Sequence, residues 1–245
     1  MRTPLVVANW KMNGSQNLCE TFSEQLRDVP DIDIWLAPPF IYIPALTEAE
    51  RLQGFTQIGV QNVHEEVQGA FTGEVSAAMV AEMGAKFAII GHSERRNIYL
   101  ENDTIVDRKL KSCVDANLIP LFCVGESIEE RQNGSAEAVV QRQLRSLKGL
   151  LETLPAERLV VAYEPIWAIG TGISASPGDA DEMHGKIRSY LGDEVAELRI
   201  LYGGSVSPNN AEKLINQSNI DGFLVGGAAL DVSAFNEICQ LVGGD

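Results

Sequence analysis

Positive charge is scarce in this chain of 245 residues, which carries 19 Lys and Arg against 34 Asp and Glu. The formal net charge is -15 at pH 7. Because no basic stripe is present to neutralise phosphate backbones, we expect no nucleic-acid partner. An anionic membrane surface would repel such a chain for the same reason. A small anionic substrate remains compatible, since one lysine and a few backbone N–H groups suffice to bind a phosphate.

Cysteine motifs and long apolar runs are also missing. No two of the four cysteines are close enough in sequence for a CxxC zinc or redox motif. No apolar run approaches the ~20 residues that cross a bilayer, and the N-terminal stretch MRTPLVVANWKMNG lacks the pattern of a secretory signal. These features predict a cytoplasmic protein with reduced thiols and no membrane partner. The cysteines are Cys19, Cys113, Cys123 and Cys239.

A flexible linker is absent as well. No stretch rich in Pro, Gly or Ser interrupts the chain, so we expect a single domain over residues 1–245. What the chain does contain is eight short apolar or β-branched runs. Their near-continuous apolar character indicates strands buried on both faces, as in a parallel sheet covered by helices. The runs cover residues 5–9, 32–37, 57–62, 86–91, 119–125, 158–164, 198–204 and 222–227.

Helix-like segments lie between these runs. Ser127 with Glu130 forms a capping-box pattern at the start of a predicted helix over 127–153. Asp179 is the expected N-cap of a helix over 179–191, and Ser207 precedes Pro208 at the start of another. Further helices are expected over 102–116 and 76–83.

The alternation of strand and helix over about 250 residues predicts an α/β fold of the (β/α)8 barrel type. A doubly wound open sheet is the alternative. It would favour a G-x-G-x-x-G turn after the first strand, where this chain has Asn9-Trp10-Lys11.

Residues that could take part in catalysis or bind a ligand follow five of the predicted strands. In (β/α)8 barrels the carboxyl ends of the strands form the active site, so these residues are expected to gather at one end. They supply an amide, an ammonium, an imidazole, a carboxylate and glycine pairs able to bind a phosphate. They are Asn9, Lys11, His92, Glu164, Gly203-Gly204-Ser205 and Gly226-Gly227.

Each of these residues also has a plain structural interpretation. An isolated Glu164 or Lys11 would ordinarily be a solvated charge, and glycine pairs commonly form tight turns. Pro165 and the WAIGTG segment beside Glu164 favour function, as does the place of His92 at an apparent helix start. There the helix N-terminus disfavours imidazolium, so a neutral ring is available to polarise a carbonyl.

The remaining histidines and the tryptophans have fewer candidate site residues beside them in the sequence. We expect His64 to be structural or at an interface, and His184 to lie on a helix surface. Trp10, Trp35 and Trp167 are expected to pack rather than to stack on a ligand.

Five motifs in sequence order resemble the triosephosphate isomerase family, and the resemblance extends from the first strand to the last. It implies a TIM barrel that isomerises triose phosphates through an enediolate. Ala229 stands where the family often has serine. The motifs are NWKMNG (9–14), GHSERR (91–96), AYEPIWAIGTG (162–172), YGGSV (202–206) and VGGAAL (225–230).

The resemblance also implies residue roles. Glu164 would be the general base, neutral His92 the donor to the substrate carbonyl, Lys11 the positive charge and Asn9 an orienting group, with Glu94 as a partner near Lys11. No metal and no cofactor are implied. The expected phosphate-binding backbone N–H groups belong to Gly170, Ser205, Gly226 and Gly227.

Two structural features are implied in the same way. The segment from Pro165 to Thr171 is expected to form a lid over the substrate. The Phe71-Thr72-Gly73-Glu74 loop resembles the family's dimer loop, which inserts into the neighbouring subunit near Lys11, so we expect a homodimer.

Other phosphate-binding barrels are the competing enzymes. A Schiff-base aldolase needs a lysine at a central strand end, where this chain has Glu164. A metal-dependent epimerase needs converging His and carboxylate ligands, and only three histidines exist. A barrel that serves as a binding or structural protein is the non-enzyme alternative, since fold alone does not fix function.

Overall fold

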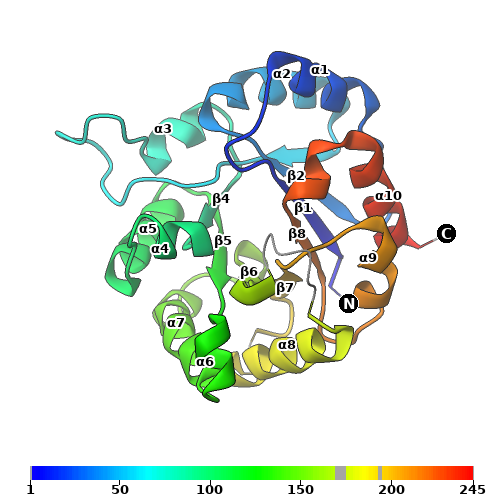
Figure 1. Ribbon diagram of the computed structural model, residues 1–245. Helices are drawn as coiled ribbons and strands as arrows, with labels where there is room; N and C mark the ends of the chain where they lie inside the picture. The colour runs from blue at the N-terminus through cyan, green and yellow to red at the C-terminus, as the bar shows by residue number, and fades with distance from the viewer. Residues whose placement is uncertain (1, 169–174, 193–194, 245) are drawn as a thin grey trace.

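The computed structural model describes residues 2–168, 175–192 and 195–244. Eight parallel strands alternate with helices along the chain, and the helices surround the strands (Figure 1). This confirms the predicted α/β class and the (β/α)8 barrel. The strands are β1 (Leu5–Asn9), β2 (Asp33–Ala37), β3 (Thr56–Ile58), β4 (Phe87–Ile90), β5 (Ile119–Val124), β6 (Val160–Tyr163), β7 (Arg199–Tyr202) and β8 (Gly222–Val225).

The sheet closes on itself. Its hydrogen-bonded order is β3-β2-β1-β8-β7-β6-β5-β4, so β3 and β4 are the two ends of one continuous sheet. These ends are joined through a parallel bridge between Val60 and Ala88. The Val60 N–H donates to the Phe87 carbonyl over 3.0 Å, and the Ile89 N–H donates to the Val60 carbonyl over 2.8 Å. All eight carboxyl ends therefore face the same side of the barrel.

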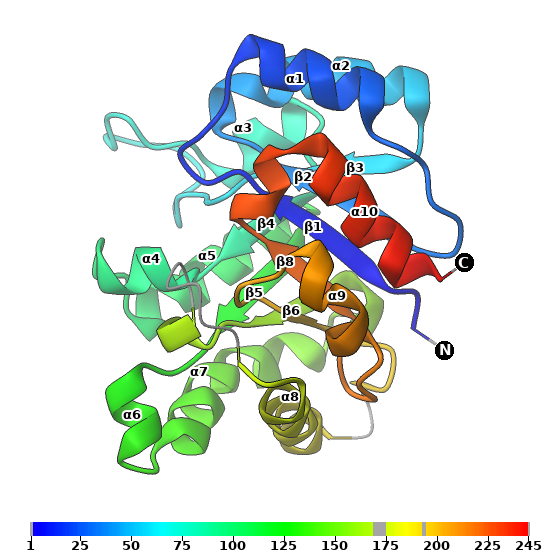
Figure 2. The same cartoon turned by 45° about the vertical axis from the view of Figure 1, so that its right-hand side comes forward.

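The helices form the outer layer, as the two views of the ribbon show (Figures 1 and 2). Short 3-10 turns add η1 (Phe40–Tyr42), η2 (Ala156–Arg158), η3 (Ile166–Ala168) and η5 (Gly227–Leu230). The helices are α1 (Gln16–Gln25), α2 (Ile43–Gln53), α3 (Ala77–Glu82), α4 (Ser93–Asn97), α5 (Asp103–Asp115), α6 (Ile128–Gln132), α7 (Ala136–Leu151), α8 (Pro177–Leu191), α9 (Pro208–Ile215) and α10 (Val232–Gly243).

Two apolar cores explain why the strands are apolar on both faces. Alternate side chains such as Leu5, Val7 and Trp35 fill the inside of the barrel. Their neighbours Val6 and Ala8 point outward and belong to the larger core shared with the helices. Since successive side chains of a strand point to opposite faces, both faces must be apolar when both are buried.

The helix N-termini agree in part with those predicted from the sequence. Ser127 and Glu130 form the predicted capping box, and Pro208 opens α9 after Ser207. The single helix expected over 127–153 is wrong, because the chain turns at Gly134, which has a φ of +78°, and continues as two helices.

The predicted N-cap at Asp179 is also wrong. Helix α8 begins earlier, at Pro177, and Ser176 is its cap. The hydroxyl of Ser176 accepts the backbone N–H of Asp179 over 3.1 Å. Pro177, at the first helical position, directly follows this cap.

Candidate active site

A cavity of about 420 Å³ opens at the carboxyl ends of the strands. It is bordered by segments that follow β1, β4, β6, β7 and β8, which are far apart in the sequence. Every residue that was predicted at a strand end as part of the site lines this cavity. Its lining comprises Asn9, Trp10, Lys11, Asn13, His92, Glu164, Gly203, Gly204, Ser205, Val206, Leu224, Gly226, Gly227, Ala228 and Leu230.

Glu164 directly follows β6 and is only 2 % exposed. Its backbone N–H donates to the carbonyl of Val124 over 2.7 Å, which extends the β5–β6 pairing by one residue. Both side-chain oxygens have donors. Oε2 accepts the backbone N–H of Ser93 over 2.8 Å, and Oε1 lies 2.9 Å from Nε2 of His92. This carboxylate is therefore a buried, oriented group and not a solvated surface charge.

His92 is the N-cap of α4 and is 5 % exposed. Its Nδ1 accepts the backbone N–H of Glu94 over 3.2 Å. An accepting Nδ1 carries no proton, so a neutral ring has its proton on Nε2, the nitrogen that faces Glu164. The cap thus fixes the tautomer and presents a donor to the cavity.

Burial and charge act in opposite directions on this pair. Burial raises the pKa of Glu164, but the charge and hydrogen bond of His92, the N–H of Ser93 and the charge of Lys11 lower it more, and the net pKa is lowered. Burial lowers the pKa of His92, whereas Glu164 and Glu94 raise it and Lys11 lowers it, with a net rise. Each partner thus stabilises the charged form of the other.

Lys11 is held in an unusual backbone conformation with a φ of +51°. Its N–H donates to Oδ1 of Asn9 over 3.0 Å, and its ammonium lies 2.7 Å from Oε1 of Glu94. Left-handed conformations of non-glycine residues cost energy and concentrate at functional sites. The two contacts direct the Lys11 side chain into the cavity beside His92.

Part of the cavity wall, next to Lys11, comes from the segments that follow β7 and β8. Ser205 follows β7, and Gly226 and Gly227 follow β8. The first N–H groups of a helical turn have no partner inside the turn, and η5 begins at Gly227. A Cβ on Gly226 would lie 3.4 Å from Cε of Lys11, so a side chain there would crowd the ammonium. This wall is suited to an anionic group.

Comparison with known proteins gives a consistent result. The family model described as triosephosphate isomerase matches residues 4–242. A triosephosphate isomerase of Nitrosococcus oceani is 44% identical over 252 residues, covering 99% of this chain and 100% of the relative. One from Alkalilimnicola ehrlichii is 46% identical over 245 residues, covering 97% and 98% respectively.

The chain belongs to the triosephosphate isomerase family. Four side chains that the family resemblance singled out, those of Asn9, Lys11, His92 and Glu164, border one cavity, and Glu94 pairs with Lys11. Gly170 and the lid residues 169–171 lie outside the described residues. Within the described part of the chain, no helix combines the length and apolar character needed to cross a membrane.

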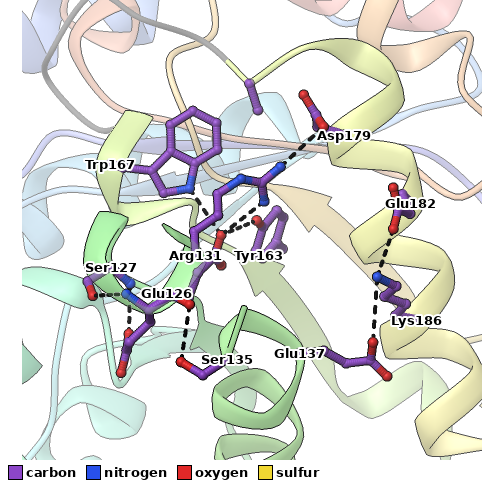
Figure 3. Close-up of polar contacts among 12 residues, drawn as sticks. Glu126, Ser127, Arg131, Ser135, Glu137, Tyr163, Trp167, Asp179, Glu182 and Lys186 are labelled. Carbon is purple, nitrogen blue, oxygen red and sulfur yellow. Dashed lines mark hydrogen bonds and ion pairs between the residues drawn. The ribbon is translucent and has the colours of Figure 1, made fainter. Parts of the chain in front are cut away.

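One carboxylate of this triosephosphate isomerase family member was not among the residues predicted from the sequence. Glu126 follows β5 and is fully buried. Its Oε1 accepts from the Tyr163 hydroxyl and from Nε1 of Trp167, both over 3.0 Å, and lies 3.3 Å from Nη1 of Arg131 (Figure 3). Its place at a strand end was the available signal. The network fixes the residues on both sides of Glu164.

Arg131 extends this network to α8. Its guanidinium lies 4.9 Å from the ring centre of Trp167, and its Nη2 lies 3.2 Å from Oδ1 of Asp179 (Figure 3). Helix α6 is thereby tied both to η3 and to the start of α8.

The prediction that His184 lies on a helix surface is wrong. His184 is fully buried in α8, where its Nδ1 contacts the carbonyl of Asn219 over 3.2 Å. Its ring is edge-on to Tyr163 at 5.7 Å. Trp10 and Trp35 are buried, which confirms their packing role, and the ring of His64 lies 4.3 Å from that of Phe71.

Proposed function

We propose that this chain catalyses the interconversion of dihydroxyacetone phosphate and D-glyceraldehyde 3-phosphate by proton transfer through an enediolate. The observation that carries the proposal is the contact between Glu164 and His92 beside Lys11 in one cavity. A base, a neutral donor and a cation are the groups that this reaction needs. Triosephosphate isomerase is itself the standard example of this division of roles.

Glu164 takes the proton from the carbon next to the substrate carbonyl and returns it to the neighbouring carbon, while the hydroxyl proton passes from the oxygen of the first carbon to the oxygen of the second. One carboxylate can serve both carbons when both protons lie on one face of the enediolate. In the described arrangement both of its oxygens are held by donors, which lowers its pKa. A substrate oxygen that takes over the His92 hydrogen bond would release Oε1 and increase the basicity of the carboxylate.

His92 and Lys11 stabilise the charge that moves to the carbonyl oxygen. Nε2–H of His92 donates to this oxygen, and the Lys11 ammonium supplies positive charge. Once Glu164 has taken the proton, its charge no longer raises the pKa of His92. Burial and Lys11 then act to lower that pKa, whereas Glu94 and the charge on the substrate oxygen act to raise it.

The phosphate group binds to backbone N–H groups of Ser205, Gly226 and Gly227, with Gly170 as a further expected donor. Lys11 adds the positive charge within reach of that wall. Asn9 orients the substrate and also holds the Lys11 backbone. Neither a metal nor an organic cofactor takes part in this scheme.

We further infer a homodimer in the cytoplasm. The segment between β3 and α3 reaches away from the barrel (Figure 1), and Phe71 and Val67 on it are 44% and 60% exposed. Met12 next to Lys11 is 95% exposed. Exposed apolar side chains of this size are typical of subunit interfaces. The four buried, unpaired cysteines fit a reducing compartment.

The test is a coupled assay of triose phosphate interconversion. Wild type should turn over rapidly, and Glu164→Gln should lose several orders of magnitude in kcat while keeping its fold by circular dichroism. Sedimentation of wild type and Phe71→Glu reports the assembly separately. A folded dimer without turnover would overturn the proposed activity.

A further inference from the structure

A second cavity, of about 570 Å³, lies at the other end of the barrel. It opens at the amino-terminal ends of the strands and is bordered by residues at or just before β3, β4, β5 and β6. The catalytic cavity opens at the opposite ends of the same strands. No described residue lines both cavities.

The charge of this second cavity is opposite to that of the chain. Among the residues that the structure describes, its lining includes Lys86 and Arg158 and contains no Asp or Glu, although the chain has a net charge of -15. Within the part of the chain that the structure describes, neither cation has an ion-pair partner. Two uncompensated cations in an otherwise acidic protein form a local site for an anion.

The backbone around the cavity is firmly held. The Lys86 N–H donates to the carbonyl of Ile58 over 2.8 Å, and the Lys86 carbonyl accepts from the N–H of Ile119 over 2.9 Å. Lys86 is thereby fixed between β3 and β5. The backbone N–H of Arg158 donates to the Pro155 carbonyl over 2.9 Å at the end of η2. Both cations therefore extend from fixed points.

Two residues that line the cavity each carry a buried polar atom without a hydrogen-bond partner. Thr47 is 8 % exposed, and its hydroxyl has no partner among the described residues; the same holds for Oε1 of Gln57. A threonine within a helix can bond to a backbone carbonyl one turn earlier, but Thr47 does not. Buried polar groups without partners are rare and call for an explanation.

The methyl group of Thr47 packs against Gly84. A Cβ on Gly84 would lie 2.6 Å from Cγ2 of Thr47, so the methyl group packs where only glycine leaves room. Gly84 has a φ of +95°, which also favours glycine. The Thr47 hydroxyl and Oε1 of Gln57 are both inaccessible in this structure, so a bound ligand would require these two side chains to rotate.

We propose that this second cavity binds a small oxyanion that also carries a hydroxyl group, such as hydrogen phosphate or a phosphorylated hydroxy acid. The anionic oxygens accept from Lys86, Arg158 and the Thr47 hydroxyl. The ligand hydroxyl donates to Oε1 of Gln57. The volume leaves room for a ligand larger than one phosphate group.

Inorganic phosphate is the probe, and backbone amide resonances are the readout. Phosphate also enters the catalytic cavity, so the signal must be local to the second cavity. The amides of Gly54, Gly84 and Asn117 border it and lie away from the catalytic cavity. We expect saturable chemical-shift changes at these amides when wild type is titrated at low salt.

Two double variants distinguish a specific phosphate site from nonspecific electrostatic attraction of phosphate to the protein. The double variant Lys86→Ala/Arg158→Ala should weaken the response at these amides at least tenfold while its isomerase activity stays at the wild-type value. The control is Arg145→Ala/Lys213→Ala, which removes the same charge from exposed positions elsewhere and should bind like wild type. An equal weakening of the phosphate response at these amides in both double variants would overturn the proposal.

Thr47→Val keeps the shape of the side chain and removes the hydroxyl. It should weaken phosphate binding at the second cavity several-fold and leave thermal stability without phosphate equal or higher, because an unpartnered buried hydroxyl is gone. Wild type that shows no saturable shift at Gly54, Gly84 and Asn117 up to high phosphate concentration would contradict the proposal outright.

Discussion

Gly125 lies against the backbone of Glu164 so closely that a Cβ on it would meet the Glu164 carbonyl oxygen at 1.8 Å. The glycine is held there from the other side by Gln143, whose Oε1 accepts the Gly125 N–H over 2.8 Å and whose Nε2 donates to the Gly125 carbonyl over 3.1 Å. The position of the candidate base therefore depends on the absence of a side chain one strand away.

Gly125→Ala should displace Glu164 and weaken its contact with His92. Overpacking of this kind costs about 1–3 kcal/mol of stability, and a shift of the base should lower kcat by about a hundredfold. Gly149→Ala is the matched control, because a Cβ there meets nothing within 4 Å and lies in α7. It should leave activity unchanged and stability equal or slightly higher. Chemical denaturation and steady-state kinetics measure both effects.

Glu94→Gln should lower kcat more than it changes KM. The ammonium of Lys11 lies 2.7 Å from Oε1 of Glu94, and loss of this ion pair leaves the cation less well positioned for the developing oxyanion. We expect a fall of about tenfold or more in kcat. Glu182→Gln removes the equally short pair with Lys186 on the surface of α8 (Figure 3), and its kinetics should equal those of wild type.

Tyr163→Phe should destabilise the protein through Glu126. The Tyr163 hydroxyl is one of three donors around Oε1 of this buried carboxylate. Removing one donor from a buried charge costs about 1–3 kcal/mol, measured as the free energy of unfolding. The double variant Tyr163→Phe/Glu126→Gln should recover part of the loss. No recovery would show that the hydroxyl acts independently of Glu126.

His184 should make stability depend on pH between about 4 and its ordinary value of 6.5. Burial lowers the pKa of His184 to about 4, so in this pH range His184 is protonated in the unfolded chain and neutral in the folded chain. The resulting stability is present above 6.5 and is lost as pH falls toward 4. The full effect is about 3 kcal/mol.

His184→Asn tests this dependence, because the asparagine amide can still donate to the carbonyl of Asn219. Unfolding of wild type and variant by denaturant at several pH values gives the comparison. The variant should lose less stability than wild type on acidification. Parallel curves for the two proteins would show that another group is responsible.

The barrel and the members of its candidate site could be predicted because both follow from local patterns. Eight apolar runs predicted eight strands, and the residues after them share one end of a parallel barrel by geometry alone. Asn9, Lys11, His92 and Glu164 were found in this way.

What could not be predicted depends on contacts between distant segments. The burial of His184 results from packing of α8 on Tyr163 and Asn219, and its own helix gives no sign of it. The orientation of Glu164 requires Ser93, at the start of α4, and Gly125, just after β5. The break at Gly134 was missed because a glycine within an apolar helical pattern does not always end a helix.

The central claim is that Glu164 carries the proton between the two substrate carbons, and solvent exchange tests it most directly. Dihydroxyacetone phosphate is incubated with enzyme in D2O, and deuterium at the reacting carbons is measured by NMR. The account predicts that wild type gives product with hydrogen where Glu164 returns the substrate's own proton and with deuterium where that proton first exchanges with solvent, and that Glu164→Gln loses both turnover and label. Turnover or label at the wild-type rate in Glu164→Gln would contradict it.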